Sequence, residues 1–188
     1  MIALVGSAMA QDNRASVGLE LGLPMGDFGD VSSIGIGGSL GFELPVADKI
    51  GLVAQAGYIS FMGKDYTSTT VVNGVVSSTT VKSDATGMIP VQVGGKYYFT
   101  DNQEGFYLGA LLGVHMQSVK EITSINLTTG AVETESKLHT NFSYAPMLGY
   151  IVGENIDLAL RYQLISAKDA ADNTVTSSYL GLRAAYMF

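Results

Sequence analysis

Apolar and polar residues alternate with a period of two through most of the chain. Segment 156–165 shows the pattern clearly, because one of its faces is entirely apolar and consists of Ile156, Leu158, Leu160, Tyr162 and Leu164. The opposite face carries Asp157, Arg161 and Gln163. Such alternation predicts a β-strand rather than a helix. The pattern predicts eight strands in all, at 14–23, 33–44, 50–62, 86–99, 105–119, 138–152, 156–165 and 174–188.

The connections between these segments alternate in length. Segments 45–49, 100–104 and 153–155 are short, whereas 24–32, 63–84, 120–137 and 166–173 are longer. An even-stranded antiparallel sheet with short turns at one end and long loops at the other requires this order. Within 63–84, Asn73-Gly74 lies between β-branched residues, which predicts a hairpin that extends the sheet beyond the membrane as a ribbon. Pro90 predicts a bulge or the edge of pairing, and the Gly- and Asp-rich 24–32 predicts a turn.

Composition changes the picture from a soluble sheet to a membrane barrel. Only 14% of the residues are charged, compared with about 25% in soluble domains, while 47% are hydrophobic. The sequence has no run of eighteen apolar residues and therefore predicts no transmembrane helix. Without cysteine it has no thiolate metal site, and its net charge of −7 argues against nucleic-acid binding. We therefore predict an all-β fold: an eight-stranded antiparallel up-and-down transmembrane β-barrel formed by residues 11–188.

Residue types indicate which face points inward. A soluble barrel of the lipocalin type has an apolar lumen, but here the more polar face consists mainly of Gly, Ala and Ser with sparse charges, which suits a narrow lumen. The predicted inward charges balance and are Glu20, Glu43, Asp157, Lys96, Arg161 and Arg183. We expect them to form a network with Gln55, Gln92, Gln117 and Gln163, with Glu20 near both arginines. The alternative is that Glu43 and Asp157 face water at the rim.

The apolar face has aromatic residues near both predicted membrane boundaries. One girdle is predicted near the short turns from Tyr97, Phe99, Phe106, Tyr150, Tyr186 and Phe188. Tyr58, Phe142 and Tyr162 are candidates for the other girdle. Residues 1–10 contain an apolar stretch and Ala8-Met9-Ala10, which predict a signal-peptide remnant cleaved after Ala10.

Five further stretches are informative: AMAQ at 8–11, PMGDFGD at 24–30, AGYISF at 56–61, GGKYYF at 94–99 and the C-terminal YLGLRAAYMF. With them the chain resembles the small eight-stranded outer-membrane β-barrel family, of the OmpX/OmpA transmembrane-domain type and most closely its Bacteroidetes-like members. The resemblance implies residence in the outer membrane of a Gram-negative bacterium, surrounded by lipid and lipopolysaccharide. It also implies that the barrel-assembly machinery reads the terminal strand through Tyr179, Leu182, Tyr186 and Phe188. The resemblance covers the barrel alone, so we expect no peptidoglycan-binding domain of the OmpA type and no anchoring to the cell wall.

Catalytic candidates are few. His115 and His139 are the histidine bases, and Ser143 shares a predicted face with His139 and Asn141. The His-x-Ser arrangement of the family's lipid A deacylases is absent, so we expect no enzyme, no catalytic or metal residues and no cofactor, with both histidines bonded in the outer lumen. We expect a structural or surface-interaction role through the outer loops. The alternatives are a small pore or hydrophobic-ligand channel, and an accessory subunit bound to other outer-membrane proteins.

Overall fold

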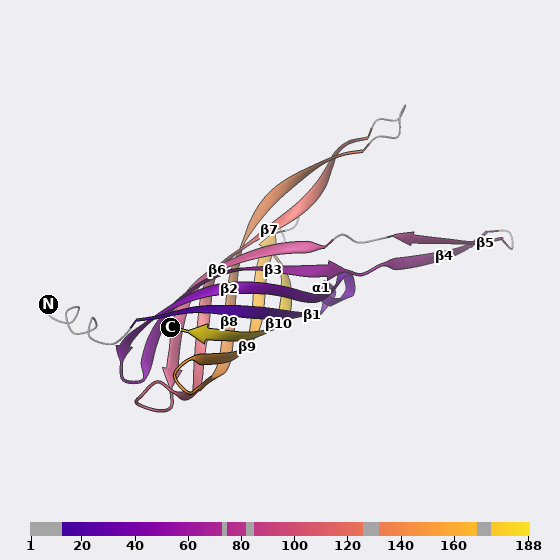
Figure 1. Ribbon diagram of the computed structural model, residues 1–188. Helices are drawn as coiled ribbons and strands as arrows, with labels where there is room; N and C mark the ends of the chain where they lie inside the picture. Colours follow the sequence, from indigo (N-terminus) through magenta and orange to yellow (C-terminus); the bar gives the residue numbers. More distant parts are fainter. Residues whose placement is uncertain (1–12, 73–74, 82–84, 126–131, 169–173) are drawn as a thin grey trace.

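The chain folds into a closed antiparallel barrel of eight strands (Figure 1). The computed structural model describes residues 13–72, 75–81, 85–125, 132–168 and 174–188. The barrel strands, in chain order, are β1 (Arg14–Met25), β2 (Ser32–Ala47), β3 (Ile50–Gly63), β6 (Thr86–Tyr98), β7 (Gly105–Ile125), β8 (Val132–Val152), β9 (Ile156–Lys168) and β10 (Thr174–Met187). The last strand pairs with both β9 and β1, so β10 closes the cylinder and the up-and-down prediction is confirmed. No helix in the described part of the chain is long and apolar enough to cross a membrane.

The alternation along each strand places side chains on the predicted faces. In β9, for example, Leu158 and Leu160 are exposed on the outside, whereas Asp157 and Arg161 are buried inside. Register between neighbours preserves this parity around the barrel, as in the pairing of Glu20 with Arg183. A shift of one residue in the pairing of two strands would exchange their inward and outward faces. Because all eight strands keep the alternation in register, the same side chains face the barrel interior all the way round.

Aromatic side chains gather on the outside near the short turns, as predicted. Three pairs of rings lie in edge-to-face contact, with centroids 4.7 to 5.8 Å apart: Phe106 with Tyr150, Tyr186 with Phe188, and Tyr97 with Phe99. All six residues are exposed on the barrel surface. Aromatic rings at this level suit the boundary between lipid and water.

Two of the long connections are more ordered than the sequence indicates. Segment 120–137 was predicted as a loop, but β7 continues to Ile125, and β8 begins at Val132 and pairs with it. Outside the lipid a paired strand needs no apolar face, so the end of the alternation did not mark the end of pairing. Segment 24–32 was predicted as a turn, but it contains the short helix α1 (Asp27–Val31).

The predicted ribbon is present, and the predicted bulge is not. Strands β4 (Tyr66–Val72) and β5 (Val75–Val81) form a separate two-stranded sheet, paired up to Val72–Val75, while the turn residues themselves lie outside the described ranges. At Pro90 the register is continuous on both sides of β6, and the ladder to β3 skips only the pairs of Pro90 itself and of Ile89. Pro90 lacks a backbone N–H, and the strand accommodates this through a local gap in hydrogen bonding.

Candidate functional site

The centre of the lumen holds all six charged residues that the alternation predicts. Each is between 2% and 7% exposed: Glu20, Glu43, Lys96, Asp157, Arg161 and Arg183. Three carboxylates face three cations, so the charges balance inside a space from which lipid and most water are excluded. The rim location considered for Glu43 and Asp157 is wrong, because both side chains are buried.

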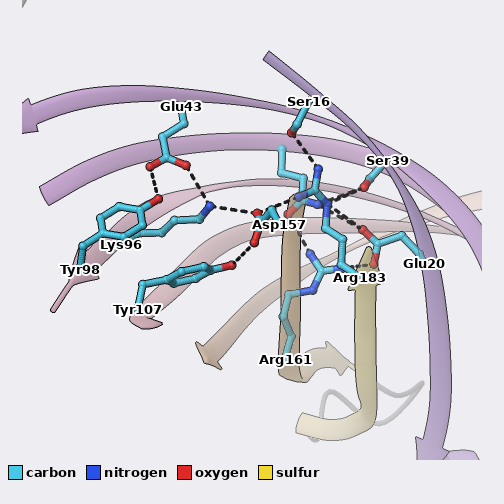
Figure 2. A network of polar contacts seen from close by, with 11 residues as sticks. Ser16, Glu20, Ser39, Glu43, Lys96, Tyr98, Tyr107, Asp157, Arg161 and Arg183 are labelled. Atoms are coloured by element: carbon cyan, nitrogen blue, oxygen red, sulfur yellow. Dashed lines mark hydrogen bonds and ion pairs between the residues drawn. The ribbon is translucent and has the colours of Figure 1, made fainter. Parts of the chain in front are cut away.

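Asp157 lies at the middle of this network (Figure 2). Its Oδ2 is 3.0 Å from Lys96 Nζ and 3.1 Å from Arg183 Nη1. Its Oδ1 accepts a hydrogen bond of 2.6 Å from the Tyr107 hydroxyl. Lys96 also reaches Glu43 Oε2 at 2.8 Å, and Tyr98 donates its hydroxyl hydrogen bond to the same carboxylate. Buried charges are tolerated only when they are paired and hydrogen-bonded in this way.

Glu20 joins the two arginines, as predicted. Its Oε2 pairs with Arg161 Nη2, and its Oε1 lies 3.5 Å from Arg183 Nε. Gln55 completes the cluster, since it donates to Glu20 Oε1 at 3.2 Å and accepts a 2.8 Å hydrogen bond from Arg161. Ser39 binds both Gln55 and Arg183. Arg161 and Arg183 therefore approach each other only because a carboxylate lies between them.

The other predicted amides lie apart from the charges. Gln92 donates to Ser143 at 3.1 Å, and Gln163 donates to the backbone carbonyl of Tyr144 at 3.2 Å. Gln117 is only half-buried. Only Gln55 of the four thus takes part in the charged network, and the wider amide network predicted from sequence is wrong in this respect.

Two of the glycines that face inward are covered by large side chains. A Cβ built on Gly149 would lie 2.1 Å from the Tyr107 ring, and one on Gly51 would lie 2.4 Å from the Glu43 carboxylate. At these two positions large side chains from neighbouring strands fill the space that the glycine provides. The remaining cavity beside the network has a volume of about 20 Å³, enough for about one water molecule.

Apolar side chains close the lumen on both sides of the network. One buried cluster contains Tyr98, Tyr107, Leu111, Ala145, Met147, Ile151, Ala159 and Met187. A second cluster contains Phe28, Ile59, Phe61, Met88, Ile165 and Tyr179. On the short-turn side, Gln103 is buried with φ of 53° and donates to the carbonyl of Ala47 at 2.7 Å.

Sequence reasoning missed the roles of three of these residues. The alternation of side chains puts Tyr98 and Tyr107 on the inward face, but it does not reveal that their hydroxyls bind the carboxylates of the network. Phe28 was read as part of a turn. Because a buried hydroxyl needs a hydrogen-bond partner, tyrosines and carboxylates that share the inward face are a general signal. This signal could have indicated the roles of Tyr98 and Tyr107.

The two histidines lie in different environments. His115 is fully buried, and its Nε2 lies 3.1 Å from the Tyr179 hydroxyl. His139 is exposed, so the prediction that both belong to the buried lumen is wrong for this residue. Ser143 is bound by Gln92 and pairs in register with Gly113 rather than with a histidine. Among the described residues, His, Cys, Asp and Glu form no group of three or more that could hold a metal ion.

Comparison with known proteins relates this geometry to solved barrels. The structure is similar to that of the attachment invasion locus protein Ail of Yersinia pestis, with a TM-score of 0.57 and 16% sequence identity. The match covers 94% of this chain and 97% of that chain. It is also similar to the N-terminal β-barrel domain of Pseudomonas aeruginosa OprF, with a TM-score of 0.55 and 12% sequence identity over 93% of this chain and 97% of that chain. Neisserial surface protein A gives 17% identity and a TM-score of 0.51, over 94% and 97%. At these identities the similarities show the fold alone.

Sequence-level comparison supplies the family. No curated protein sequence matches the chain. The family model described as the outer membrane protein β-barrel domain matches residues 1–188. The match spans every strand of the barrel described above, including the closing strand β10. The chain therefore belongs to the outer membrane protein β-barrel domain family and is an integral protein of the Gram-negative outer membrane.

Proposed function

We propose that this protein is a closed, non-enzymatic barrel that acts at the cell surface through two projecting β-ribbons. The observation that carries the proposal is the contrast between a filled lumen and the hairpins beyond it. The cavity beside the charged network has a volume of about 20 Å³, which is room for about one water molecule. The ribbons β4–β5 and the outer part of β7–β8 extend from the end of the barrel opposite the C terminus (Figure 1).

Both ribbons offer backbone edges for contact. Strands β4 and β5 pair with each other alone within the described residues, and 66–81 contains neither a charge nor a proline. Residues of β7 beyond Ser118 pair with β8 and not with β6. Unpaired N–H and C=O groups along such edges can accept an additional strand from a partner. These features favour recognition of another surface protein.

The charge of the chain bears on the class of partner. Ail has been crystallised with sucrose octasulfate, a heparin analogue. The present chain carries a net charge of −7, which would repel a polyanion in water. A protein partner is therefore favoured over a sulfated glycan. Lipid and lipopolysaccharide around the apolar face, and the barrel-assembly machinery during insertion, complete the partners proposed for the chain.

The alternative functions have less support. A small pore needs an aqueous path, and six buried charges with their tyrosine partners occupy it. An accessory role in a larger outer-membrane complex would use the same ribbons, so it is a variant of this proposal. Co-purification after gentle detergent extraction distinguishes the accessory role from a role at the surface of another cell.

Replacing the ribbon 66–81 tests the proposal directly. One variant substitutes this segment with a Gly/Ser-rich sequence of equal length, which keeps the connection but removes the strand pairing. Bacteria that display the natural protein should attach to one another or to host cells, and the variant should lose most of this attachment. Equal attachment by the two, at equal amounts of folded barrel in the outer membrane, would contradict a surface role for β4–β5.

A further inference from the structure

The ribbon β4–β5 is a sheet of two strands only. Its strands lie side by side beyond the barrel, and neither pairs with a barrel strand in the described part of the chain (Figure 1). A two-stranded sheet is marginally stable in water, and three or more strands are needed for independent stability. The outer edges of β4 and β5 therefore favour the addition of a further strand.

The ribbon lacks the features that normally protect a free edge. Charged residues, prolines and β-bulges discourage the pairing of exposed strands. Segment 66–81 contains no charge and no proline. Its register runs without a shift from the first pair, Tyr66 with Val81, to the last pair, Val72 with Val75. Uncharged seven-residue strands that are rich in β-branched residues are the kind that pair with copies of themselves.

The ribbon formed by the outer parts of β7 and β8 has such protection. Its two strands carry five charged residues, which are Lys120, Glu121, Glu133, Glu135 and Lys137. Its register also shifts between Ile122 and Ser124, as at a β-bulge. Both ribbons extend from the same end of the barrel (Figure 1). The edges of β4–β5 are therefore the better suited of the two to strand pairing.

The sequence of the ribbon β4–β5 reads almost the same in both directions. TSTTVV at 67–72 runs outward, and VVSSTT at 75–80 returns. The register therefore places like residues opposite each other, with Val opposite Val in two pairs and Thr or Ser opposite Thr or Ser in four. Pairs of this kind stabilise a sheet. Strand β4 of a second copy therefore matches β5 as well as the β4 of the same chain does.

The membrane gives two neighbouring copies the same register. The apolar outer faces hold both barrels at one depth, so both ribbons begin at the same height above the lipid. Strand β5 of one copy then runs antiparallel to β4 of the other, and Tyr66 lies opposite Val81 as it does within one ribbon. Ribbons on two facing cells would be antiparallel only as β4 with β4 or β5 with β5. In the first of these, full overlap would place Thr67 opposite Val71, so the like pairs favour copies in one membrane.

We propose that two copies of this chain in one membrane pair through their β4–β5 ribbons, with β5 of one copy beside β4 of the other. The contact forms a four-stranded sheet in the order β4–β5–β4–β5. It rests on the proposed function, in which the ribbons act through their edges, and it names a second copy as the partner. The chain has a net charge of −7, and the uncharged ribbon is a place where two copies meet without opposing like charges.

Disulfide cross-linking tests the contact, since the natural chain contains no cysteine. Thr69→Cys and Ser78→Cys are made in separate full-length chains, because these positions lie opposite each other in the register. The two variants are mixed, folded into lipid vesicles and oxidised. Opposed residues of antiparallel strands have Cα atoms about 4.5–5.5 Å apart, which a disulfide can span. The mixture should form dimers at least about tenfold faster than either variant alone, since only opposed positions meet this geometry.

A second opposed pair and a shifted pair control the register. Thr67→Cys with Thr80→Cys is also directly opposed and should cross-link as the first pair does. Thr67→Cys with Ser78→Cys is out of register and should cross-link several times more slowly. Equal rates for the opposed and the shifted pairs would overturn the proposal, because they indicate collision without a fixed register. Dimers from Thr69→Cys alone, formed as fast as in the mixture, would also overturn it, because they require β4 beside β4. The gel mobility of the folded barrel controls for misfolding in each variant.

The attachment assay separates this inference from the proposed function. The variant with a Gly/Ser-rich sequence at 66–81 can lose attachment while neither opposed cysteine pair forms dimers. That result would overturn the second copy as the partner and leave the ribbon acting on a different protein. Dimers from both opposed pairs, together with unchanged attachment by the Gly/Ser-rich variant, would support the contact between copies and contradict the role of the ribbon in attachment.

Discussion

Replacing Asp157 by asparagine tests the charged network most sharply. The substitution keeps the size of the side chain but removes one negative charge from the centre of the lumen. Lys96, Arg161 and Arg183 then face only Glu20 and Glu43. Lys96 and Arg183 both lose a carboxylate partner at about 3 Å, and both remain buried.

The expected loss of stability is large because the site is buried. Removing one partner of a buried ion pair costs about 3–5 kcal/mol, since the remaining charge stays out of water without compensation. The matched control is Asp101→Asn, which breaks the surface pair between Asp101 and Lys49. The atoms of this pair are 3.1 Å apart, but the side chains are 80% and 40% exposed. Exposed pairs contribute about 0–1 kcal/mol.

Urea unfolding of the barrel in lipid vesicles measures both free energies. Asp157→Asn should lower the free energy of unfolding by several times the effect of Asp101→Asn. Adding Lys96→Met to Asp157→Asn leaves two charges of each sign, so the double variant should be more stable than the sum of the single effects predicts, by about 1 kcal/mol or more. Equal small losses for Asp157→Asn and Asp101→Asn would refute the reasoning, because the lumen charges would then be solvated.

Three further outcomes follow from the barrel wall and the turns. Gly149→Ala places a methyl group 2.1 Å from a buried tyrosine ring and should lower the free energy of unfolding by about 1–3 kcal/mol. In Gly181→Ala the nearest contact of the new methyl group is at 3.4 Å, so the loss should be much smaller. Leu19→Arg, in the middle of β1 on the lipid side, should destabilise the barrel by about 2–4 kcal/mol. Val46→Arg, on the outside near the short turn, should destabilise it by only about 0–1 kcal/mol. Equal effects would place the membrane boundary elsewhere. The hydrogen bond that Lys49 donates to Asp101 raises the pKa of Lys49, so the pair contributes at neutral pH and is lost as the pH rises through that pKa. Asp101→Asn should lower the pKa of Lys49 in an NMR titration.

The period of two was enough to identify the lumen. It assigns each residue to a face, and the even count of strands with alternating loop lengths implies closure. For this reason Glu20, Arg161 and Arg183 could be placed together from the sequence alone. Parity does not give depth along the barrel, which depends on strand tilt and stagger. The pairing of Asp157 with Lys96, sixty-one positions apart, and of Tyr98 with Glu43 therefore needed the structure.

The outer end was harder to predict, for two physical reasons. Strands outside the lipid lose the apolar face that marks them in sequence, so the extension of β7 and β8 was invisible to the hydrophobic pattern. Phe28 lies among glycines and aspartates, whose turn signal outweighs a single aromatic residue. Its burial depends on Phe61 in β3 and on the space over Gly22 in β1 and Gly35 in β2, so it is set by three strands together.

Ion conductance of the purified barrel in a planar lipid bilayer tests the central claim most directly. The claim is that the lumen is closed by a balanced network of buried charges with packed aromatic residues on either side. We predict no discrete single-channel steps from the natural protein, in low or high salt and at either polarity. Reproducible steps from protein whose gel mobility shows it to be folded would contradict the closed lumen and favour a pore.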